Sequence, residues 1–441
     1  MRKLRFYISL IIARSILFIF KTTKVSSGTA IIGLITLKIC PDFMSIANEY
    51  ITDAKVNITG TNGKTTTSGL ITHLVREARK SVINNSMGAN MLNGIVNALA
   101  LQINPFKKTE ISIIETDEAF VESVFKEFKS NYLLVTNLFR DQLDRYGELA
   151  TTKKFIQNGI DINPEVQLVL NADDPLVASF KYDKKTPIFF GVEKVSFEYE
   201  QVETSSKMGE IYNCNCGKPL KYSKRFYEQQ GHYYCDCGYS RPEPKYKANI
   251  TLYKTYSILN INNEEFKIPL VGLFNAYNAL GAIAIAKELG IRDIQKNIET
   301  FKVAFGRSEV KYLNEHRTLI QLIKNPAGAS EVLKTVDLNS NIMIVINDNY
   351  ADGRDISWIW DAEFEILKNI KKEIVIAGSR AEDMALRLKY GEIPVNKIKI
   401  IKDLKLAIEY IERNADEDIT ILPTYTALLK INKIKNFRRG N

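Results

Sequence analysis

Short apolar runs separated by stretches of helical periodicity dominate the chain from residue 54 onward. Apolar runs of about four to eight residues predict buried β-strands, and the amphipathic stretches between them predict helices. Strands that alternate with helices fold into a parallel sheet covered on both faces. The first series of strands is expected at Val56–Thr59, Ser81–Ile83, Ile111–Glu115, Tyr132–Thr136 and Val166–Leu170.

The alternation stops at Ser205–Pro244, a segment with four cysteines and no helical period, where we predict an insertion. Beyond it, Asn249–Ile261 and Phe266–Val271 are expected to be strands, and Asn275–Leu289 an alanine-rich helix. A second alternating series begins near Thr318 and predicts a second α/β domain. Its strands are expected at Leu319–Ile323, Ile342–Ile346, Ile374–Ala377, Lys397–Ile401 and Ile419–Leu422.

These patterns divide the chain into three regions. Residues 1–50 form a basic, amphipathic N-terminal segment. Residues 51–300 form a central domain that carries the insertion at about 205–244, and residues 301–441 form a C-terminal α/β domain. The boundary between the two α/β domains is expected within Phe301–Glu309.

The N-terminal segment opens with Arg2, Lys3 and Arg5 and continues as a mostly apolar run at 6–20, which Arg14 interrupts. No small-residue cleavage site follows, and the run is too short and too charged for a spanning helix. We predict an amphipathic helix packed on the protein core or, alternatively, lying on a bilayer surface. The chain is therefore expected in the cytoplasm, with contact at the inner face of the membrane as the alternative, and its cysteines as thiols or metal ligands.

The net charge of +9 is concentrated at the two ends of the chain. Residues 1–50 hold seven Lys/Arg against two Asp/Glu, and residues 430–441 hold five basic residues and no acidic one, so the middle is close to neutral. A nucleic-acid-binding protein carries its positive charge on a folded face. This distribution argues against a nucleic-acid partner and favours a membrane surface or an anionic lipid.

A phosphate-binding loop is predicted between a strand and a helix. Backbone N–H groups of such a loop cradle phosphates, the lysine (Lys64) reaches the terminal phosphates, and the hydroxyl of Thr65 holds Mg²⁺. The alternatives are an ordinary glycine-rich turn or a degenerate scaffold without nucleotide. The predicted nucleotide-binding residues are Gly60, Thr61, Asn62, Gly63, Lys64, Thr65 and Thr66.

Ile58 stands where the long form of this loop has glycine, so the loop has the short form found in Mur ligases and folylpolyglutamate synthases. Further strings in the same order make the chain resemble the Mur ligases. The resemblance implies that Glu115 binds Mg²⁺, that Asn275 and Asn278 lie beside the nucleotide, and that Arg307 faces it. The strings are Thr136-Asn137, Asn171–Pro175, Gly272–Asn278 and Gly306–Glu309.

The chain departs from the Mur ligases that add amino acids. Gln142 and Phe274 replace histidines of that pattern, and no lysine stands in register with the family's carbamylated lysine near Phe155–Gln157. These departures agree with the branch of the family that amidates a glutamate of lipid II. The rival within the family is a ligase acting on a UDP-linked precursor or on folate.

Two cysteine pairs separated by 18 residues predict a structural zinc ribbon. Four thiolates close a tetrahedral site and leave no position for a reactive water. The short C-x-C spacing leaves His232 as an alternative ligand to Cys214. A ribbon in the central domain is a feature of the lipid II-amidating branch, whereas the rival from another class is a zinc-ribbon nucleic-acid-binding NTPase. The expected ligands are Cys214, Cys216, Cys235 and Cys237.

A third motif, Asn347–Trp358, follows a predicted strand and so lies at the carboxyl edge of the second sheet. The alternative is an acidic loop that caps the next helix. The resemblance implies that Asp355 orients the histidine of a glutaminase partner and completes its Cys-His-Asp triad. Strings of the same branch stand at Lys324–Gly328, Gly378–Glu382 and Pro423–Thr426.

The expected chemistry is ATP-dependent amidation of the α-carboxyl of D-glutamate in the lipid II stem peptide, through an acyl phosphate stabilised by Lys64, Thr65, Glu115 and Mg²⁺. The chain has three histidines, and its one cysteine outside the insertion is Cys40, so it offers no Cys-His pair for glutamine hydrolysis. Ammonia is therefore expected from a separate glutaminase of the class I glutamine amidotransferase type (GatD-like). ATP, Mg²⁺ and structural Zn²⁺ are the expected cofactors.

Overall fold

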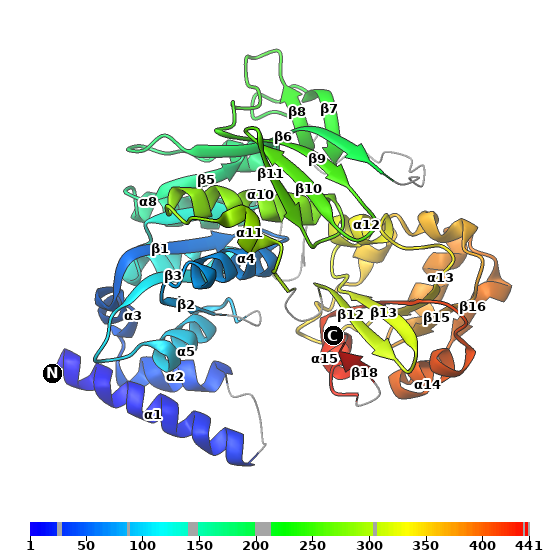
Figure 1. The fold of residues 1–441 in the computed structure, drawn as a ribbon, viewed down its shortest axis with the longest axis horizontal. Coiled ribbons are helices and arrows are strands. Elements are labelled where there is room, and N and C mark those ends of the chain that lie inside the picture. Colours follow the sequence, from blue (N-terminus) through cyan, green and yellow to red (C-terminus); the bar gives the residue numbers. More distant parts are fainter. Residues whose placement is uncertain are drawn as a thin grey trace.

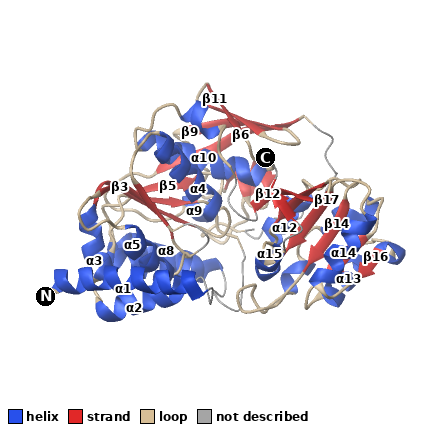
Figure 2. Cartoon of the chain, turned by 60° about the horizontal axis from the view of Figure 1, so that its bottom comes forward, coloured by secondary structure: helices blue, strands red, loops and turns tan. Residues whose placement is uncertain are grey.

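The computed structural model describes residues 1–23, 29–85, 89–139, 149–198, 213–302, 307–434 and 437–439 (Figure 1). Two mainly parallel sheets with helices packed against them form separate bodies (Figure 2). This confirms the α/β class. A two-stranded ribbon adjoins the first sheet, and a layer of N-terminal helices lies at the other side of the same body.

The first sheet has nine strands in the order β11-β10-β9-β6-β5-β4-β1-β3-β2. Strands β1 to β6 and β9 pair in parallel, and β9, β10 and β11 form an antiparallel edge. The strands are β1 (Ile51–Thr59), β2 (Val82–Asn84), β3 (Thr109–Glu115), β4 (Tyr132–Val135), β5 (Gln167–Asn171), β6 (Ile188–Phe197), β9 (Tyr246–Leu252), β10 (Ser257–Ile261) and β11 (Glu264–Ile268).

Helices cover both faces of this sheet because successive strand residues point to opposite sides. Ile113 of β3 belongs to one core with helices α4 (Lys64–Glu77), α10 (Leu273–Glu288) and α11 (Ile294–Ile298). Its neighbour Ile114 belongs to the core on the other face. The helices of that second face are α5 (Leu92–Gln102), α6 (Val121–Glu127), α8 (Leu149–Ile162) and α9 (Pro175–Ala178), with the 3₁₀ turn η2 (Glu118–Phe120) before α6.

The N-terminal helices extend this second core outward. Phe6, Leu10 and Ala13 of α1 (Arg2–Thr23) are buried together with residues of α2 (Thr29–Ile39) and α3 (Phe43–Ala47). The predicted amphipathic helix is therefore present, with one face packed on the core. Among the described residues no single helix is long and apolar enough to cross a membrane. One pair of helical segments, Ala30–Ile39 and Phe43–Tyr50, is long and apolar enough only when the two are taken together, and it is bent by 94°.

The second sheet has the order β16-β15-β14-β17-β13-β12-β18, with β13 to β17 parallel and β12 and β18 antiparallel to their neighbours. Its strands are β12 (Arg307–Leu313), β13 (His316–Gln321), β14 (Asn341–Val345), β15 (Ile374–Ala377), β16 (Ile398–Ile400), β17 (Ile419–Pro423) and β18 (Phe437–Arg439). Its helical elements are α12 (Pro326–Leu333), η3 (Ser357–Trp360), η4 (Phe364–Asn369), α13 (Ala381–Tyr390), η5 (Val395–Lys397), α14 (Leu404–Asn414) and α15 (Tyr425–Ile431).

The single strand predicted over Asn249–Ile261 is wrong. The segment forms two antiparallel strands, β9 and β10, joined by a turn in which the N–H of Tyr253 donates to the carbonyl of Tyr256 at 3.0 Å. The residue alternation continues on both sides of this turn, so the periodicity alone concealed it. The strands β6, β12 and β18 and the two ribbon strands of the insertion were not predicted, since their segments mix polar and apolar residues.

Candidate active site

A glycine-rich loop joins β1 to α4 in the first sheet. Gly60 and Gly63 have φ of 122° and 88°, values that favour glycine. A Cβ on Gly60 would lie 2.4 Å from Oγ1 of Thr136, and one on Gly63 would lie 1.9 Å from Oδ1 of Asn278. The backbone is thus shaped into a tight cradle at the N-terminus of α4, where free N–H groups and the helix dipole favour an anion.

The loop is hydrogen-bonded to Thr136 and Asn137, the two residues that follow β4. The N–H of Asn62 donates to Oδ1 of Asn137 at 2.9 Å, and Nδ2 of Asn137 donates back to the carbonyl of Asn62 at 3.1 Å. The hydroxyl of Thr136 donates to the same carbonyl at 2.8 Å. Because β1 and β4 are neighbours in the sheet, the two loops at their carboxyl ends support each other.

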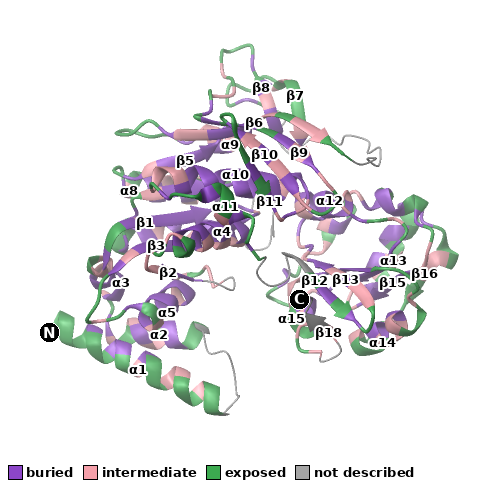
Figure 3. Cartoon of the chain, viewed as in Figure 1, coloured by how far each residue is buried: buried purple, intermediate pink, exposed green. Residues whose placement is uncertain are grey.

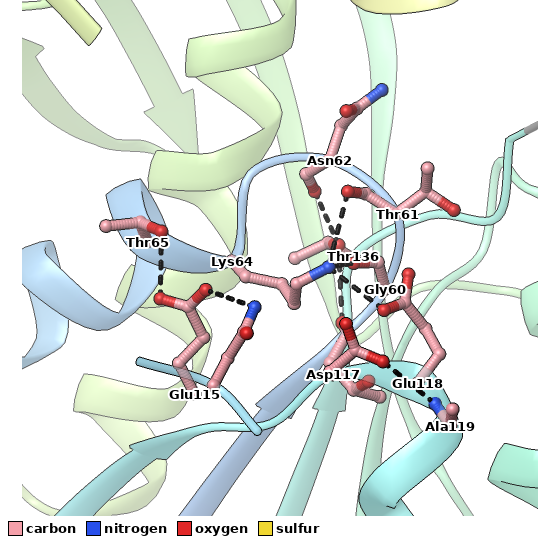
Figure 4. Close-up of polar contacts among 12 residues, drawn as sticks. Gly60, Thr61, Asn62, Lys64, Thr65, Glu115, Asp117, Glu118, Ala119 and Thr136 are labelled. Atoms are coloured by element: carbon pink, nitrogen blue, oxygen red, sulfur yellow. Dashed lines mark hydrogen bonds and ion pairs between the residues drawn. The ribbon is translucent and has the colours of Figure 1, made fainter. Parts of the chain in front are cut away.

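Lys64 points back over the loop rather than into solvent (Figure 4). Its ammonium donates to the carbonyl of Gly60 at 2.5 Å and to Oε2 of Glu118 at 3.0 Å, in a pair that is almost fully buried. Burial lowers the pKa of Lys64, but Glu118, Asp117 and Glu115 outweigh it, so the pKa ends above its ordinary value. The ammonium is therefore charged and paired with a buried carboxylate.

Glu115 ends β3 next to the loop and lies 2 % exposed. Its Oε2 accepts from the hydroxyl of Thr65 at 2.8 Å, and its Oε1 accepts from Nδ2 of Asn90 at 3.1 Å (Figure 4). The side chain of Asn85 holds the backbone of Glu115 through two hydrogen bonds of 2.7 Å. The hydroxyl of Thr65 and the carboxylate of Glu115 thus lie next to each other, and both are oxygen ligands suited to Mg²⁺ beside a phosphate.

A cleft opens beside the loop and encloses about 720 Å³ of empty space, including the part open to solvent. The first body contributes the loop, the start of α10 and the string after β4, and the second body contributes β13 and α12. The polar and aromatic residues that line it include Asn62, Thr66, Asn137, Phe139, Tyr227, Phe274, Asn275, Asn278, Gln321, Lys324 and Glu331.

The two bodies are joined directly at this cleft. Nδ2 of Asn325 donates to Oδ1 of Asn62 at 2.9 Å, and Nδ2 of Asn62 donates to Oδ1 of Asn325 at 3.3 Å. Asn325 also caps α12 by accepting from the N–H of Gly328. Of the predicted nucleotide-side residues, Asn275 and Asn278 line the cleft; the side chain of Arg307 lies outside the described residues.

The four cysteines of the insertion come together in two similar turns. Their sulfur atoms all lie within 4.8 Å of one another, and two pairs, Cys214 with Cys237 and Cys216 with Cys235, are 3.6 Å apart. Zn–S bonds of about 2.3 Å in a tetrahedron place sulfurs about 3.8 Å apart, so the residues fit a zinc ion. His232 does not join them, because its Nε2 donates to the carbonyl of Val192 at 2.8 Å.

The ribbon strands β7 (Lys221–Tyr227) and β8 (Gln230–Tyr234) lead from the cysteines toward the cleft. At the opposite end of the hairpin, Nε2 of the buried Gln229 donates to the carbonyl of Leu138 at 2.6 Å, and Tyr227 lines the cleft. Arg241, just beyond the ribbon, forms an ion pair of 2.6 Å with the buried Asp173. The insertion is therefore part of the wall of the cleft and not a detached knob.

Removing one zinc ligand is expected to show this connection. Cys235→Ser should lower the metal content from about one zinc per chain to none and lower the midpoint of thermal unfolding, because the hairpin loses its closed end. Metal analysis and calorimetry measure both. Cys40→Ala is the matched control and should keep its zinc; a Cys235→Ser protein with zinc and an unchanged unfolding midpoint would contradict the assignment.

The motif at the carboxyl end of β14 has a buried half and an exposed half. Asp352 is buried and accepts from the N–H of Thr426 at 2.6 Å and from its hydroxyl at 2.5 Å. Asp355 is half-exposed, and its Oδ1 accepts from the N–H of Ser357 at 2.8 Å at the start of η3. Asp352 therefore fixes the loop, and Asp355 presents a carboxylate at its surface.

The loops after β14, β15 and β17 meet at this edge. The hydroxyl of Thr424 accepts from the N–H of Asn347 at 3.1 Å, and Oδ1 of Asn347 accepts from the N–H of Ser379 at 3.0 Å. Asn325 follows β13 at the same edge, since these strands are parallel. The segments that follow β13, β14, β15 and β17 thus lie at one edge of the second sheet. Asn325 connects this edge to the glycine-rich loop of the first body.

Several polar residues of the site could not be predicted from the sequence. Glu118, Asn90 and Asn325 were not assigned roles, although Glu118 follows Glu115 closely and Asn325 stands in a recognised string. Their contacts depend on the pairing of distant strands and of the two bodies, which a single sequence does not reveal. The available signal for Glu118 was its place in the acidic run Glu115-Thr116-Asp117-Glu118, directly after a predicted strand.

Comparison with known families agrees with this geometry. The Mur ligase middle domain matches residues 58–286, and the MurT ligase C-terminal domain matches residues 322–428. The chain is 38% identical over 412 residues to "Lipid II isoglutaminyl synthase (glutamine-hydrolyzing) subunit MurT" of Staphylococcus aureus (strain COL), covering 91% of each chain. It is 33% identical over 428 residues to the protein of the same name in Streptococcus pneumoniae, covering 94% of each.

Solved structures support the fold. A pseudomurein peptide ligase type C from Methanothermus fervidus superimposes with a TM-score of 0.69 at 24% identity, covering 88% of this chain and 80% of that one. MurF ligase from Thermotoga maritima in complex with ADP gives 0.60 at 15% identity, covering 88% and 81%. On the matched domains and the relatives aligned along nearly its whole length, the chain belongs to the MurT family of Mur ligases.

Proposed function

We propose that the chain is the synthetase subunit of a lipid II isoglutaminyl synthase. It amidates the α-carboxyl of D-glutamate in the stem peptide with ammonia released by a separate glutaminase. The observation that carries this proposal is the contact between the two bodies. The edge that presents Asp355 also supplies Asn325, which pairs with Asn62 of the phosphate-binding loop.

The reaction begins with an in-line transfer of the γ-phosphoryl group of ATP to a carboxylate oxygen, which releases ADP and forms an acyl phosphate. Backbone N–H groups of the loop and the ammonium of Lys64 hold the phosphates. Thr65 and Glu115 would hold Mg²⁺, which would supply charge neutralisation there. Ammonia then attacks the acyl carbon, the C–N bond forms, and inorganic phosphate leaves with the electron pair of the C–O bond.

Lys64 must change partner for this to happen. In the structure it bonds to Glu118 and to the loop's own carbonyls, so the incoming phosphates replace Glu118 as its counter-charge. The released Glu118 carboxylate lies beside the reacting groups, where it can accept a proton from the attacking nitrogen. Burial raises the pKa of Glu118, with Lys64 acting against this, which suits a proton acceptor in a closed site.

The glutaminase partner is proposed to dock on the second body. The chain has three histidines and no Cys-His pair of its own for glutamine hydrolysis. Near the Asp355 loop, Trp360 is 44 % exposed and packs edge-on against Tyr390, which is 70 % exposed. Val395 in the turn before the edge strand β16 and Ile400 at the end of this strand add exposed apolar surface. Such a patch beside a half-exposed carboxylate suits a permanent partner.

The proposal is tested by supplying the purified chain and its glutaminase with ATP, glutamine and either lipid II or UDP-linked precursors. We expect ADP release coupled to amidation of the stem peptide with lipid II, and glutamate release only when both subunits are present. Amino-acid addition to a UDP-linked precursor would instead identify an amino-acid ligase. Salt-sensitive binding to DNA or RNA with no amidation would favour the nucleic-acid-binding NTPase.

Tyr227 is expected to contact the nucleotide base from the ribbon side of the cleft. It is buried against Phe139 and Tyr277, with ring centroids 5.7 Å and 5.6 Å away, and it lines the cleft opposite α12. Tyr227→Ala should weaken ATP binding by about tenfold, whereas Tyr227→Phe should change it little, since stacking uses the ring. Titration with a fluorescent ATP analogue measures this; equal losses in both variants would contradict a stacking role.

A further inference from the structure

The outer face of α1 carries an apolar stripe that the core does not use. Leu4, Ile8, Ile11 and Phe18 are 63 %, 40 %, 66 % and 69 % exposed. Their spacing places them on one side of a helix, opposite the buried inner face of α1. Figure 3 shows α1 at the margin of the molecule with exposed residues along its length. A soluble surface seldom leaves so many large apolar side chains in one line without a partner.

A further exposed apolar side chain, that of Phe106, lies on a turn beside α1. Phe106 is 97 % exposed at the tip of a turn in which Asn104 bridges to Lys107. The turn begins at Ile103, whose carbonyl accepts from Nη2 of Arg14 of α1 at 2.5 Å. The turn therefore projects next to the middle of α1. We call Leu4, Ile8, Ile11, Phe18 and Phe106 the N-terminal face.

The charges around the N-terminal face have one sign. The first 41 residues contain seven lysines and arginines and no aspartate or glutamate. Helical spacing places Lys3, Arg14 and Lys21 along one margin of the stripe, and Lys107 and Lys108 directly follow Phe106. Arg2 and Lys3 form exposed ion pairs with Asp42 and Glu49, which weaken but do not reverse the positive balance.

We propose that the N-terminal face binds an anionic phospholipid surface, with α1 lying in the plane of the membrane. Large apolar side chains between cations are what an interfacial helix presents to acyl chains and lipid phosphates. The other face of α1 is fixed to the protein core, so the helix lies on the bilayer and does not cross it. This inference goes beyond the proposed ligase activity and requires no nucleotide.

The same layer connects to the active site. Gly33 of α2 packs so closely on α5 that a Cβ there would lie 1.8 Å from the carbonyl oxygen of Asn93. Asn90, just before α5, donates to Glu115 at 3.1 Å. The membrane-bound layer is thus two helices away from the carboxylate beside the phosphate-binding loop.

The test is sedimentation of the full chain with vesicles. Wild-type protein should bind vesicles of equal parts phosphatidylglycerol and phosphatidylcholine, and bind pure phosphatidylcholine at least about tenfold less. The double variant Ile11→Glu/Phe18→Glu should lose at least about tenfold in binding to the anionic vesicles. Leu406→Glu, an exposed leucine on α14 that is 57 % exposed, is the matched control and should bind as wild type.

Two parallel measurements keep the outcome clear. Thermal unfolding and binding of a fluorescent ATP analogue should be unchanged in the double variant, because both side chains point away from the core. Wild-type protein that stays in the supernatant with anionic vesicles, or a double variant that binds them as wild type does, overturns the proposal. The proposal is also overturned if the wild-type protein is a dimer and the double variant is a monomer, since the N-terminal face would then be an interface between copies. A wild-type protein that does not bind the ATP analogue would contradict the proposed ligase function and not the membrane proposal.

Discussion

Lys64→Ala is expected to lower ATP-dependent amidation by about a hundredfold to a thousandfold, because the phosphates lose the side-chain cation of the loop itself. The same change should also weaken the fold. It leaves Glu118 buried, 6 % exposed, without its counter-charge, and removal of one partner of a buried ion pair costs about 3–5 kcal/mol. Steady-state amidation and the unfolding midpoint separate the two effects.

A double variant distinguishes catalysis from stability. Lys64→Met/Glu118→Gln removes both buried charges, so its unfolding midpoint should recover toward wild type while amidation stays low. Lys126→Ala, which breaks an exposed pair with Glu122, is the matched control and should change neither quantity by much. If the double variant regains activity together with stability, Lys64 has no role in phosphate binding and the proposed function fails.

Asp355→Asn is expected to lower glutamine-dependent amidation by roughly ten-thousandfold, the loss seen when the carboxylate that orients a catalytic histidine becomes an amide. Amidation driven by added ammonium salts should be nearly unchanged, and so should ATP binding, because Asp355 is half-exposed on a loop of the second body. Paired assays with glutamine and with ammonium chloride measure the difference.

Asp352→Asn provides the contrast three residues earlier. Asp352 accepts hydrogen bonds from the backbone and the hydroxyl of Thr426, so its replacement should lower the unfolding midpoint. The rate of amidation should fall equally with glutamine and with ammonium chloride. An Asp355→Asn protein that loses ATP binding would show that this residue supports the fold or the cleft. An unchanged rate with glutamine would show that the partner's histidine is oriented by another group.

Most of the parallel strands could be predicted from the sequence because their segments are short, mainly apolar runs. β15 coincides with its predicted range, and β3 and β17 differ from theirs by one or two residues. The paired strands β9 and β10 were merged, since alternation continues through their turn. β6 and β12 escaped prediction because their side chains are partly exposed or polar, and position in the sheet, not local pattern, makes them strands.

The candidate site was predictable where chemistry requires a fixed string of neighbours. Gly60 to Thr66 and the four cysteines are such strings, and the structure brings each group together. The partners of these groups come from elsewhere in the chain. Glu118 meets Lys64 across 54 residues, and Asn325 meets Asn62 across 263, through contacts that no local spacing encodes. The role of Asp355 stays a prediction until its partner is present.

The ion pair between Lys64 and Glu118 has a consequence for ligand choice. Because Glu118 neutralises the charge of Lys64, a small anion gains little attraction from this lysine. Inorganic phosphate would have to compete with a buried carboxylate 3.0 Å away, and it lacks the extra contacts of a nucleotide. We therefore expect a polyphosphate that also fills the cleft to displace Glu118 more readily than the small anions of the cell do.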